Sequence, residues 1–271
     1  MIPIALTIAG SDPSGGAGIQ ADLKTFSALE VYGASIITAL TAQNTKGVAA
    51  IHRVPAEFVQ AQMDAVFSDL DVSAVKVGMM WQADIIGVVA AGLERWQQRA
   101  VVLDPVMLAS SGDILLAPEA REALKRTLCP RALIITPNLP EAAALLGAPV
   151  ARTEAEMREQ GERLLMLGPQ AVLVKGGHGD GPQSIDLLVE RKACTRLTAN
   201  RIPARNTHGT GCTLSSAIAA GLAKGMQLAD AVRSAKDFVT AALAAADTIS
   251  VGSGQGPLHH FHASWSKSLQ Q

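Results

Sequence analysis

Short apolar segments alternate with longer amphipathic segments along most of the chain. The apolar segments are residues 4–9, 34–40, 74–77, 100–103, 133–136 and 171–174. Near-continuous apolar runs of this length are typical of strands in a parallel sheet that is covered on both faces. The amphipathic segments between them have the length of crossover helices and comprise residues 19–29, 56–67, 83–96 and 118–128. The pattern therefore predicts an α/β protein built from βαβ units.

The pattern changes after the last of these strands and around the helix that precedes it. Thr153 and Glu156 have the spacing of a capping box, and Gly168 with Pro169 ends the helix that they start. Within residues 184–201, apolar and polar positions alternate on both sides of a polar turn. This alternation predicts two antiparallel strands that extend the sheet.

The C-terminal part of the sequence contains two alanine-rich segments, residues 212–222 and 228–246, which predict two more helices. Residues 250–271 have the least regular pattern, and we interpret them as a surface tail. Three histidines of this tail, His259, His260 and His262, leave metal binding as the alternative. Because no repeat or linker interrupts the chain, we expect residues 1–271 to form a single domain.

Composition and charge restrict the class of protein. A chain of 271 residues suits one α/β unit, and 48% hydrophobic against 17% charged residues is far from the composition of disordered chains. The formal net charge is −1, so there is no surplus of basic residues for binding phosphate backbones. Nucleic-acid binding is therefore disfavoured.

The distribution of apolar and cysteine residues suggests a location. No apolar run approaches the ~20 residues needed to cross a bilayer, and the first basic residue is Lys24, so the positive start of a secretion signal is missing. Cys129, Cys194 and Cys212 are scattered without the spacing of a metal site or a disulfide framework. We expect a cytoplasmic protein with reduced thiols and no membrane partner.

A glycine-rich loop, residues 10–18, follows the first predicted strand and opens a helix. Residues 16–21 match the letters of the G-x-G-x-x-A dinucleotide fingerprint. However, no acidic residue occurs between Glu30 and Glu57 to hold ribose hydroxyls, and the lysine of a Walker A motif is absent. A nicotinamide site and a P-loop site are therefore both disfavoured.

The segment from Asn206 to Thr213 is the strongest candidate for chemistry. Gly209 and Gly211 precede an alanine-rich helix, so successive N–H groups at the helix start can point at one anion. Simple helix capping is the alternative. Cys212 lies where these N–H groups are expected to lower the pKa of a thiol, which favours a base or nucleophile, although a structural cysteine explains its position equally well.

Polar residues also follow three other predicted strands. Asp104, Asn138, Glu141 and Lys175 stand where the carboxyl ends of parallel strands bind ligands. Carboxylates suit magnesium and lysine suits phosphate oxygens, so together they indicate a nucleotide-dependent phosphotransferase. Taken singly, Asp104 is also consistent with a turn residue and Glu141 with a helix N-terminus.

Six motifs in a fixed order resemble the bacterial hydroxymethylpyrimidine/phosphomethylpyrimidine kinases of the ribokinase-like superfamily. They are residues 9–22, 41–45, 77–79, 104–107, 136–141 and 209–212. The resemblance covers essentially the whole chain. It implies a three-layer αβα fold with a mostly parallel central sheet, and usually a homodimer. The implied activity is phosphorylation of 4-amino-5-hydroxymethyl-2-methylpyrimidine by ATP with Mg²⁺, first to the monophosphate and then to the diphosphate used for thiamine diphosphate.

The resemblance also implies roles for individual residues. It places the pyrimidine beside Ala17, Asp22, Gln43, Met79, Val106 and Cys212. The nucleotide phosphates would contact Lys175, Thr210, Asn138 and Lys236, and magnesium would be ordered by Asp104 and Glu141. Phosphoryl transfer itself would involve Gly209, Thr210, Gly211, Cys212 and Lys175. Ribokinase-like sugar kinases carry aspartate as the base where this chain has Cys212, and the pyrimidine-kinase branch that it resembles carries cysteine there.

Two other functions remain open from the sequence. A pyridoxal or pyridoxine kinase of the same superfamily phosphorylates an alcohol on a ring of similar size. A non-catalytic binding protein is a different class, but the intact Gly209, Gly211, Lys175 and Asp104 argue against it.

Overall fold

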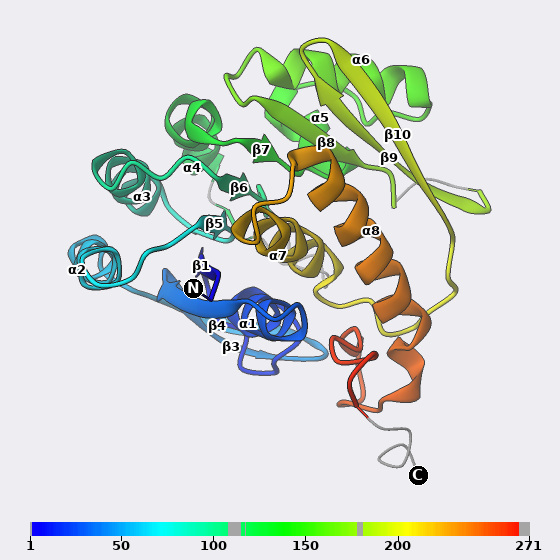
Figure 1. The fold of residues 1–271 in the computed structure, drawn as a ribbon, viewed down its shortest axis with the longest axis horizontal. Helices are drawn as coiled ribbons and strands as arrows, with labels where there is room; N and C mark the ends of the chain where they lie inside the picture. The colour runs from blue at the N-terminus through cyan, green and yellow to red at the C-terminus, as the bar shows by residue number, and fades with distance from the viewer. Residues whose placement is uncertain (1, 108–114, 117, 178–180, 266–271) are drawn as a thin grey trace.

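An eight-stranded sheet runs through the structure, a computed structural model that describes residues 2–107, 115–116, 118–177 and 181–265 (Figure 1). The strand order is β10-β9-β8-β7-β6-β5-β1-β2. The six adjacent strands β2, β1, β5, β6, β7 and β8 are parallel to one another, whereas β9 is antiparallel to both β8 and β10. The strands are β1 (Ile4–Ala9), β2 (Tyr32–Ile37), β5 (Ala74–Val77), β6 (Val101–Leu103), β7 (Ile134–Ile135), β8 (Ala171–Lys175), β9 (Gln183–Glu190) and β10 (Ala193–Asn200).

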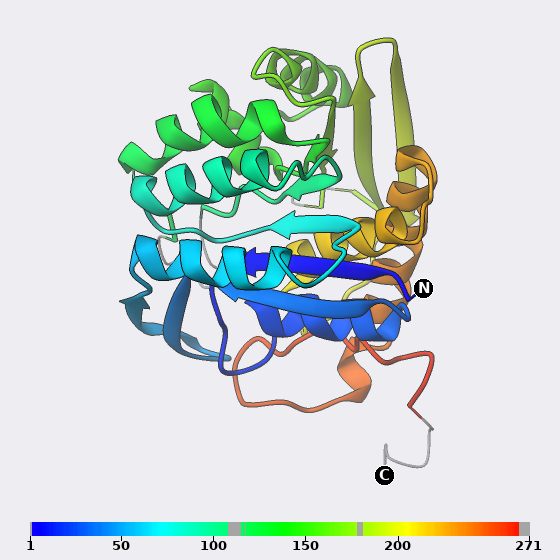
Figure 2. The ribbon, with the colours of Figure 1, turned by 60° about the vertical axis from the view of Figure 1, so that its left-hand side comes forward.

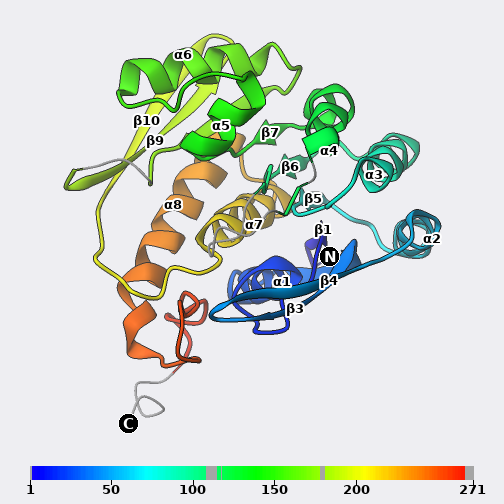
Figure 3. The same cartoon turned by 180° about the vertical axis from the view of Figure 1, so that it is seen from behind.

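Helices cover both faces of this sheet (Figures 1 and 3). One layer contains α2 (Ala56–Phe67), α3 (Ala83–Arg95), α4 (Pro118–Ala123), α5 (Leu139–Leu146) and α6 (Glu154–Leu165). Figure 2 shows α2 and α3 of this layer side by side in front of the strands. The opposite layer contains α1 (Gly18–Ala28), α7 (Thr210–Ala223) and α8 (Leu228–Ala244). The expected three-layer αβα arrangement is confirmed.

The apolar runs are explained by the two cores that lie between the sheet and the helical layers. Successive side chains of a strand point to opposite faces, so Leu6 and Ile8 enter one core while Ala5 enters the other. All three are fully buried. A strand that is covered on both faces has no solvent-facing positions, so its residues are mostly apolar and any polar side chain in it needs a partner.

The prediction of a single strand over residues 34–40 is wrong. β2 ends at Ile37, and β3 (Ala39–Asn44) pairs with β4 (Gly47–Arg53) in a separate two-stranded sheet. The chain changes direction at Thr38, whose N–H donates to the carbonyl of Ala9 and whose hydroxyl donates to that of Met79. Both sides of the bend are apolar, so the hydrophobic pattern did not reveal it.

Most of the other predicted elements are confirmed. The capping box at α6 is present, with the Thr153 hydroxyl accepting from the N–H of Glu156 at 3.2 Å. The helix predicted over residues 118–128 begins as α4 and continues as a π-helical turn, Leu124–Leu128. Among the described residues, no helix has the length and apolarity to cross a membrane.

The prediction of a surface tail after residue 250 is wrong for residues 256–260, which are buried. His259 and His260 are only 2% and 4% exposed. His260 Nε2 lies 3.0 Å from the Thr213 hydroxyl in the first turn of α7. Within the described part of the chain, no three histidine, cysteine or acidic side chains gather as metal ligands. These histidines therefore anchor the C-terminal segment to the body of the protein.

Burial of His260 makes stability depend on pH. Burial, followed by the positive charge of Lys24, lowers the pKa of His260 to about 4. The unfolded state therefore binds a proton near pH 6.5, whereas the folded state resists it until about pH 4. His260 therefore contributes ~2–3 kcal/mol to the free energy of unfolding above pH 6.5. This contribution is lost as the pH falls from 6.5 to about 4.

We predict that His260→Gln, which keeps a polar group near Thr213 but does not titrate, loses less stability between pH 7 and pH 4.5 than the wild type. Urea unfolding at both pH values measures the difference, because other titrating groups are common to the two proteins. Equal losses in the two proteins would contradict this account of His260.

Candidate functional site

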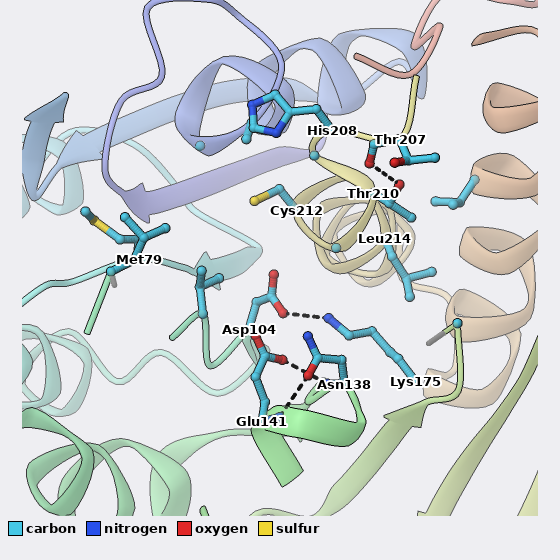
Figure 4. Close-up of a pocket in the computed structure, with 18 of the residues that line it drawn as sticks. Met79, Asp104, Asn138, Glu141, Lys175, Thr207, His208, Thr210, Cys212 and Leu214 are labelled. Atoms are coloured by element: carbon cyan, nitrogen blue, oxygen red, sulfur yellow. Dashed lines mark hydrogen bonds and ion pairs between the residues drawn. The ribbon is translucent and has the colours of Figure 1, made fainter. Parts of the chain in front are cut away.

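A cavity of about 830 Å³ lies at the carboxyl ends of the parallel strands, where α/β sheets bind their ligands. Its walls combine the loops after these strands, the first turn of α7 and the β3–β4 hairpin (Figure 4). All the predicted site residues except Asp22 line it: Ala17, Gln43, Met79, Asp104, Val106, Asn138, Glu141, Lys175, Gly209, Thr210, Gly211, Cys212 and Lys236. The fold thus brings together residues that are far apart in the sequence.

Asp22 lies beneath the cavity and does not line it. Its side chain is fully buried, and its carboxylate oxygens lie 2.7 Å and 2.9 Å from Lys76 Nζ. It also accepts hydrogen bonds from the hydroxyls of Thr7 at 2.6 Å and Ser216 at 2.7 Å. The direct contact with a substrate ring that we expected of Asp22 is therefore not provided by this geometry.

Lys76, the partner of Asp22, lines the cavity instead of Asp22. The sequence analysis missed this residue. Burial favours its neutral form, but the adjacent Asp22 carboxylate outweighs burial and raises the pKa of Lys76. The side chain is therefore a buried cation at neutral pH. The signal in the sequence was a lysine inside the otherwise apolar strand β5, because lysine is almost never fully buried unless it is paired.

The segment that we predicted to bind an anion forms the first turn of α7. Gly209 caps the helix with a left-handed backbone (φ 82°), and a methyl group there would collide with the carbonyl of Gly16. Only glycine allows this close approach at low cost. Gly211 is less restricted, since a Cβ atom there would lie 3.2 Å from Lys175 Nζ, at the end of a flexible side chain. Helix N-termini leave N–H groups without intrahelical acceptors, and the residues of this turn, Gly209 to Cys212, line the cavity.

The expectation that these N–H groups lower the pKa of Cys212 is wrong. Cys212 is reachable from the cavity, yet burial raises the pKa of its thiol to about 11. The positive charge of Lys76 opposes this rise, whereas the carboxylates of Asp22 and Asp104 add to it. The thiol is therefore protonated at neutral pH, because desolvation and nearby negative charge exceed the effect of the helix terminus.

Asp104 and Lys175 form an ion pair on the sheet side of the cavity, with 3.0 Å between Asp104 Oδ1 and Lys175 Nζ (Figure 4). The hydroxyls of Thr136 and Ser215 also donate to Asp104. Burial alone would raise the pKa of Asp104, but the charges of Lys175 and Lys76 hold it below its ordinary value. Asp104 is therefore ionised, and Lys175, whose pKa the same pairing raises, is a cation at the cavity wall.

Asn138 and Glu141 form a capping box at the start of α5. Glu141 is therefore a helix N-terminal residue, as one of the two explanations expected, and it also lines the cavity. The N–H of Glu141 donates to Asn138 Oδ1, and the N–H of Asn138 donates to Glu141 Oε2, both at 2.8 Å. Burial raises the pKa of Glu141 to about 7, with the Asp104 carboxylate adding to the rise and Lys175 opposing it. A cation in the cavity would favour its ionised form.

Lys236 reaches the cavity from α8. Its Nζ lies 2.6 Å from Asp186 Oδ2 and 3.2 Å from the Ser184 carbonyl oxygen. The lining also includes apolar side chains from α8 and the segment after β10, namely Ile202, Val239 and Leu243. The cavity therefore combines charged groups with apolar surface.

The cavity lining carries a second feature that the sequence analysis missed, the pair His208 and Asp12. His208 Nε2 lies 2.8 Å from Asp12 Oδ2 and 3.4 Å from Gln43 Nε2. Burial would raise the pKa of Asp12, but the hydrogen bonds of His208 and Ser14 outweigh it and lower the pKa. Asp12 also accepts from the N–H groups of Gly16 and Ala17, so it organises the glycine-rich loop around itself.

The register of the β3–β4 pairing shifts between Ala42 and Gln43. Such irregularities re-aim side chains, and Gln43 lines the cavity across from Met79, which is 7% exposed. One amide between apolar walls can orient a small polar ring through a donor and an acceptor.

Comparisons with known proteins agree with this geometry. The phosphomethylpyrimidine kinase family matches residues 12–259. The hydroxymethylpyrimidine/phosphomethylpyrimidine kinase of Rhizobium meliloti is 60% identical over 265 residues, which cover 98% of this chain and 99% of that protein.

Two solved structures are also similar. The phosphomethylpyrimidine kinase of Clostridium difficile has a TM-score of 0.78 and 46% identity, covering 89% of this chain and 98% of that one. The pyridoxal kinase of Staphylococcus aureus in complex with AMP-PCP and pyridoxal has a TM-score of 0.89 and 33% identity, covering 97% and 95%. The expected ribokinase-like fold is thereby confirmed, and the chain belongs to the phosphomethylpyrimidine kinase family.

Proposed function

We propose that this protein uses ATP to phosphorylate 4-amino-5-hydroxymethyl-2-methylpyrimidine and then the resulting monophosphate, giving the diphosphate that serves thiamine diphosphate formation. The observation that carries the proposal is the Asp104–Lys175 pair, which lies beside the first turn of α7 in a cavity that Gln43 and Met79 also line. The 60% identity to a kinase of that name along nearly the whole chain supports the same activity.

The ring of the substrate would lie between Ala17, Met79 and Val106. The Gln43 amide would form hydrogen bonds with the amine and the adjacent ring nitrogen of the substrate. In this position the hydroxymethyl group points toward Cys212 and the turn at Gly209. Asp22 would not touch the substrate, and its role would be to hold Lys76 in place through their buried ion pair.

The nucleotide would occupy the remainder of the cavity. Lys175, Thr210, Asn138 and Lys236 would contact its phosphates, and the apolar side chains of Val239 and Leu243 suit a purine ring. The N–H groups of the α7 turn and the Lys175 ammonium then surround the phosphoryl group that is transferred. Fixed donors and cations at this point stabilise the charge that spreads over its oxygens.

The residues present also fit a magnesium ion. Asp104 and Glu141 are buried carboxylates at the same cavity wall, and the Asp104 charge raises the pKa of Glu141. Mg²⁺ prefers one or two carboxylates together with phosphate oxygens, so these two residues would hold it. When bound, the ion would neutralise charge on the nucleotide phosphates.

A pyridoxal kinase is the second candidate, favoured by the higher TM-score of the S. aureus pyridoxal kinase. Similarity of fold does not select a substrate, however, because site residues do so. The full-length identity of 60% to a pyrimidine kinase therefore carries more weight.

We predict that the wild type, with ATP and Mg²⁺, phosphorylates the pyrimidine alcohol with a higher kcat/KM than pyridoxal. In Gln43→Leu the polar edge of the ring loses its partner, so KM for the pyrimidine rises ~5–100-fold while KM for ATP is unchanged. Coupled measurement of ADP release with each alcohol gives these constants. A preference for pyridoxal would select the second candidate, and no turnover of either alcohol would reject both.

We predict a modest role for Cys212, because its thiol is protonated at neutral pH. Cys212→Ala should lose less than the ~10²–10⁴-fold in kcat that removal of a general base costs. Gly211→Val should lose more than Cys212→Ala, since its side chain would displace Lys175.

The pH dependence of kcat separates the two roles of Cys212. If the thiolate were the base, the rate of the wild type would climb with pH toward about 11, and Cys212→Ala would lose that climb. We expect parallel profiles for the two proteins between pH 7 and pH 9. Divergent profiles would restore Cys212 as the base.

We also propose a homodimer, as the family resemblance implies. Large apolar side chains are exposed on β2, β3 and α2, namely Tyr32 at 53%, Leu40 at 43% and Phe58 at 59%. Sedimentation should give twice the mass of one chain, and Phe58→Lys with Leu40→Lys should shift it toward one chain. A wild type that sediments as a monomer at assay concentrations would rule the dimer out.

A further inference from the structure

The alternating glycines Gly252, Gly254 and Gly256 have no role in the chemistry described above. They follow a short 3₁₀ turn, Ala246–Thr248, and precede the buried histidines. Two segments of the cavity wall lie against them. One is the tip of the β3–β4 hairpin, and the other is the loop that leads into Gly209.

The contacts with the hairpin converge on Thr45, which lies two residues after Gln43. The N–H of Gln255 donates to the Thr45 carbonyl at 2.9 Å, and the N–H of Gly254 donates to the Thr45 hydroxyl at 3.1 Å. A methyl group at Gly252 or Gly254 would collide with Thr45. Glycine is therefore required here for close approach of the two backbones.

The contacts with the loop involve the residues immediately before the anion-binding turn. The N–H of His208 donates to the Gly256 carbonyl at 3.0 Å, and the N–H of Gly256 donates to Asn206 Oδ1 at 3.1 Å. The Gln255 side chain also bonds to the Thr207 hydroxyl. A methyl group at Gly256 would collide with Asn206.

The hairpin depends on such support because it is a two-stranded sheet outside the central one. Isolated two-stranded hairpins are marginally stable in water. Gln43 is part of this hairpin, whereas the donors to phosphate belong to α7 and its preceding loop. Residues 252–256 touch both parts with main-chain hydrogen bonds.

We propose that residues 252–256 act as a clasp that positions the ring-binding hairpin against the phosphate-binding turn. This inference rests on the proposed function, since it assigns the clasp to recognition of the pyrimidine. Displacing a substrate by ~1 Å from its reactive geometry can cost ~10²-fold in rate, so a fixed distance between Gln43 and Gly209 matters for catalysis. The glycines of the clasp are positioning residues, because they act through the hairpin and the loop, whereas Gln255 also lines the cavity itself.

The decisive variant is Gly254→Ala, which forces the clasp away from Thr45. We expect KM for the pyrimidine to rise by ~10-fold or more, KM for ATP to stay unchanged, and amide hydrogen exchange to quicken in residues 39–53. Ser253→Ala, one residue away and exposed, is the matched control, and Gly87→Ala, where a methyl group meets nothing within 4 Å, controls for the added methyl. Both should match the wild type in KM and exchange.

A double-mutant cycle tests whether the effect passes through Thr45. Thr45→Val removes the hydroxyl that accepts from Gly254, and it should raise KM and hairpin exchange less than Gly254→Ala does. If the clasp is already displaced in Gly254→Ala, adding Thr45→Val changes nothing further. Should Gly254→Ala fail to fold, Thr45→Val alone gives the same two readouts.

The outcomes separate the clasp from the proposed function. If the wild type phosphorylates the pyrimidine and Gly254→Ala leaves both KM and hairpin exchange unchanged, the clasp is wrong. If the wild type turns over no pyrimidine, the proposed function fails and hydrogen exchange alone decides whether the clasp holds the hairpin. A rise in both KM values, or faster exchange throughout the chain, would indicate general destabilisation and would also overturn the clasp.

Discussion

Pairing of buried charges at the carboxyl ends of the strands is the constraint on which the site depends. Three aspartates whose side chains are at most 6% exposed each lie within 3.0 Å of a lysine. The pairs are Asp22 with Lys76, Asp104 with Lys175, and Asp186 with Lys236. An unpaired charge at this depth costs several kcal/mol, and removing one partner of a buried pair typically costs ~3–5 kcal/mol. Each aspartate therefore determines where its lysine stands.

The same pairing fixes the positions of three lysine side chains at the cavity. The three lysines all line it, and each is already held in place before a ligand arrives. Cations and N–H groups that need no rearrangement stabilise developing charge more effectively than flexible ones do. The capping box of α5 has two uses in the same way, because Asn138 and Glu141 start a helix and both residues also line the cavity. Local folding preferences and the demands of the site therefore coincide.

Much of the fold and of the site was legible in local sequence patterns. Continuous apolar runs predicted the parallel strands, since burial on both faces leaves no polar positions. Polar residues directly after those runs predicted the cavity lining, because parallel strands end at one edge of a sheet. Residues 34–40 were misread for the same reason, since an apolar run does not show where the chain bends from one sheet into another.

Local sequence patterns were enough to predict most strands of the central sheet, the glycine-rich turn at Gly209 and the polar residues that follow the strands, Asp104, Asn138, Glu141 and Lys175. These depend on neighbours along the chain, through hydrophobic period, capping and turn chemistry. Only the tertiary structure decided that Asp22 supports Lys76, that the thiol of Cys212 is protonated and that the C-terminal segment joins the hairpin to the α7 loop. Desolvation and charge pairing are set by groups distant in sequence, so no local pattern contains them.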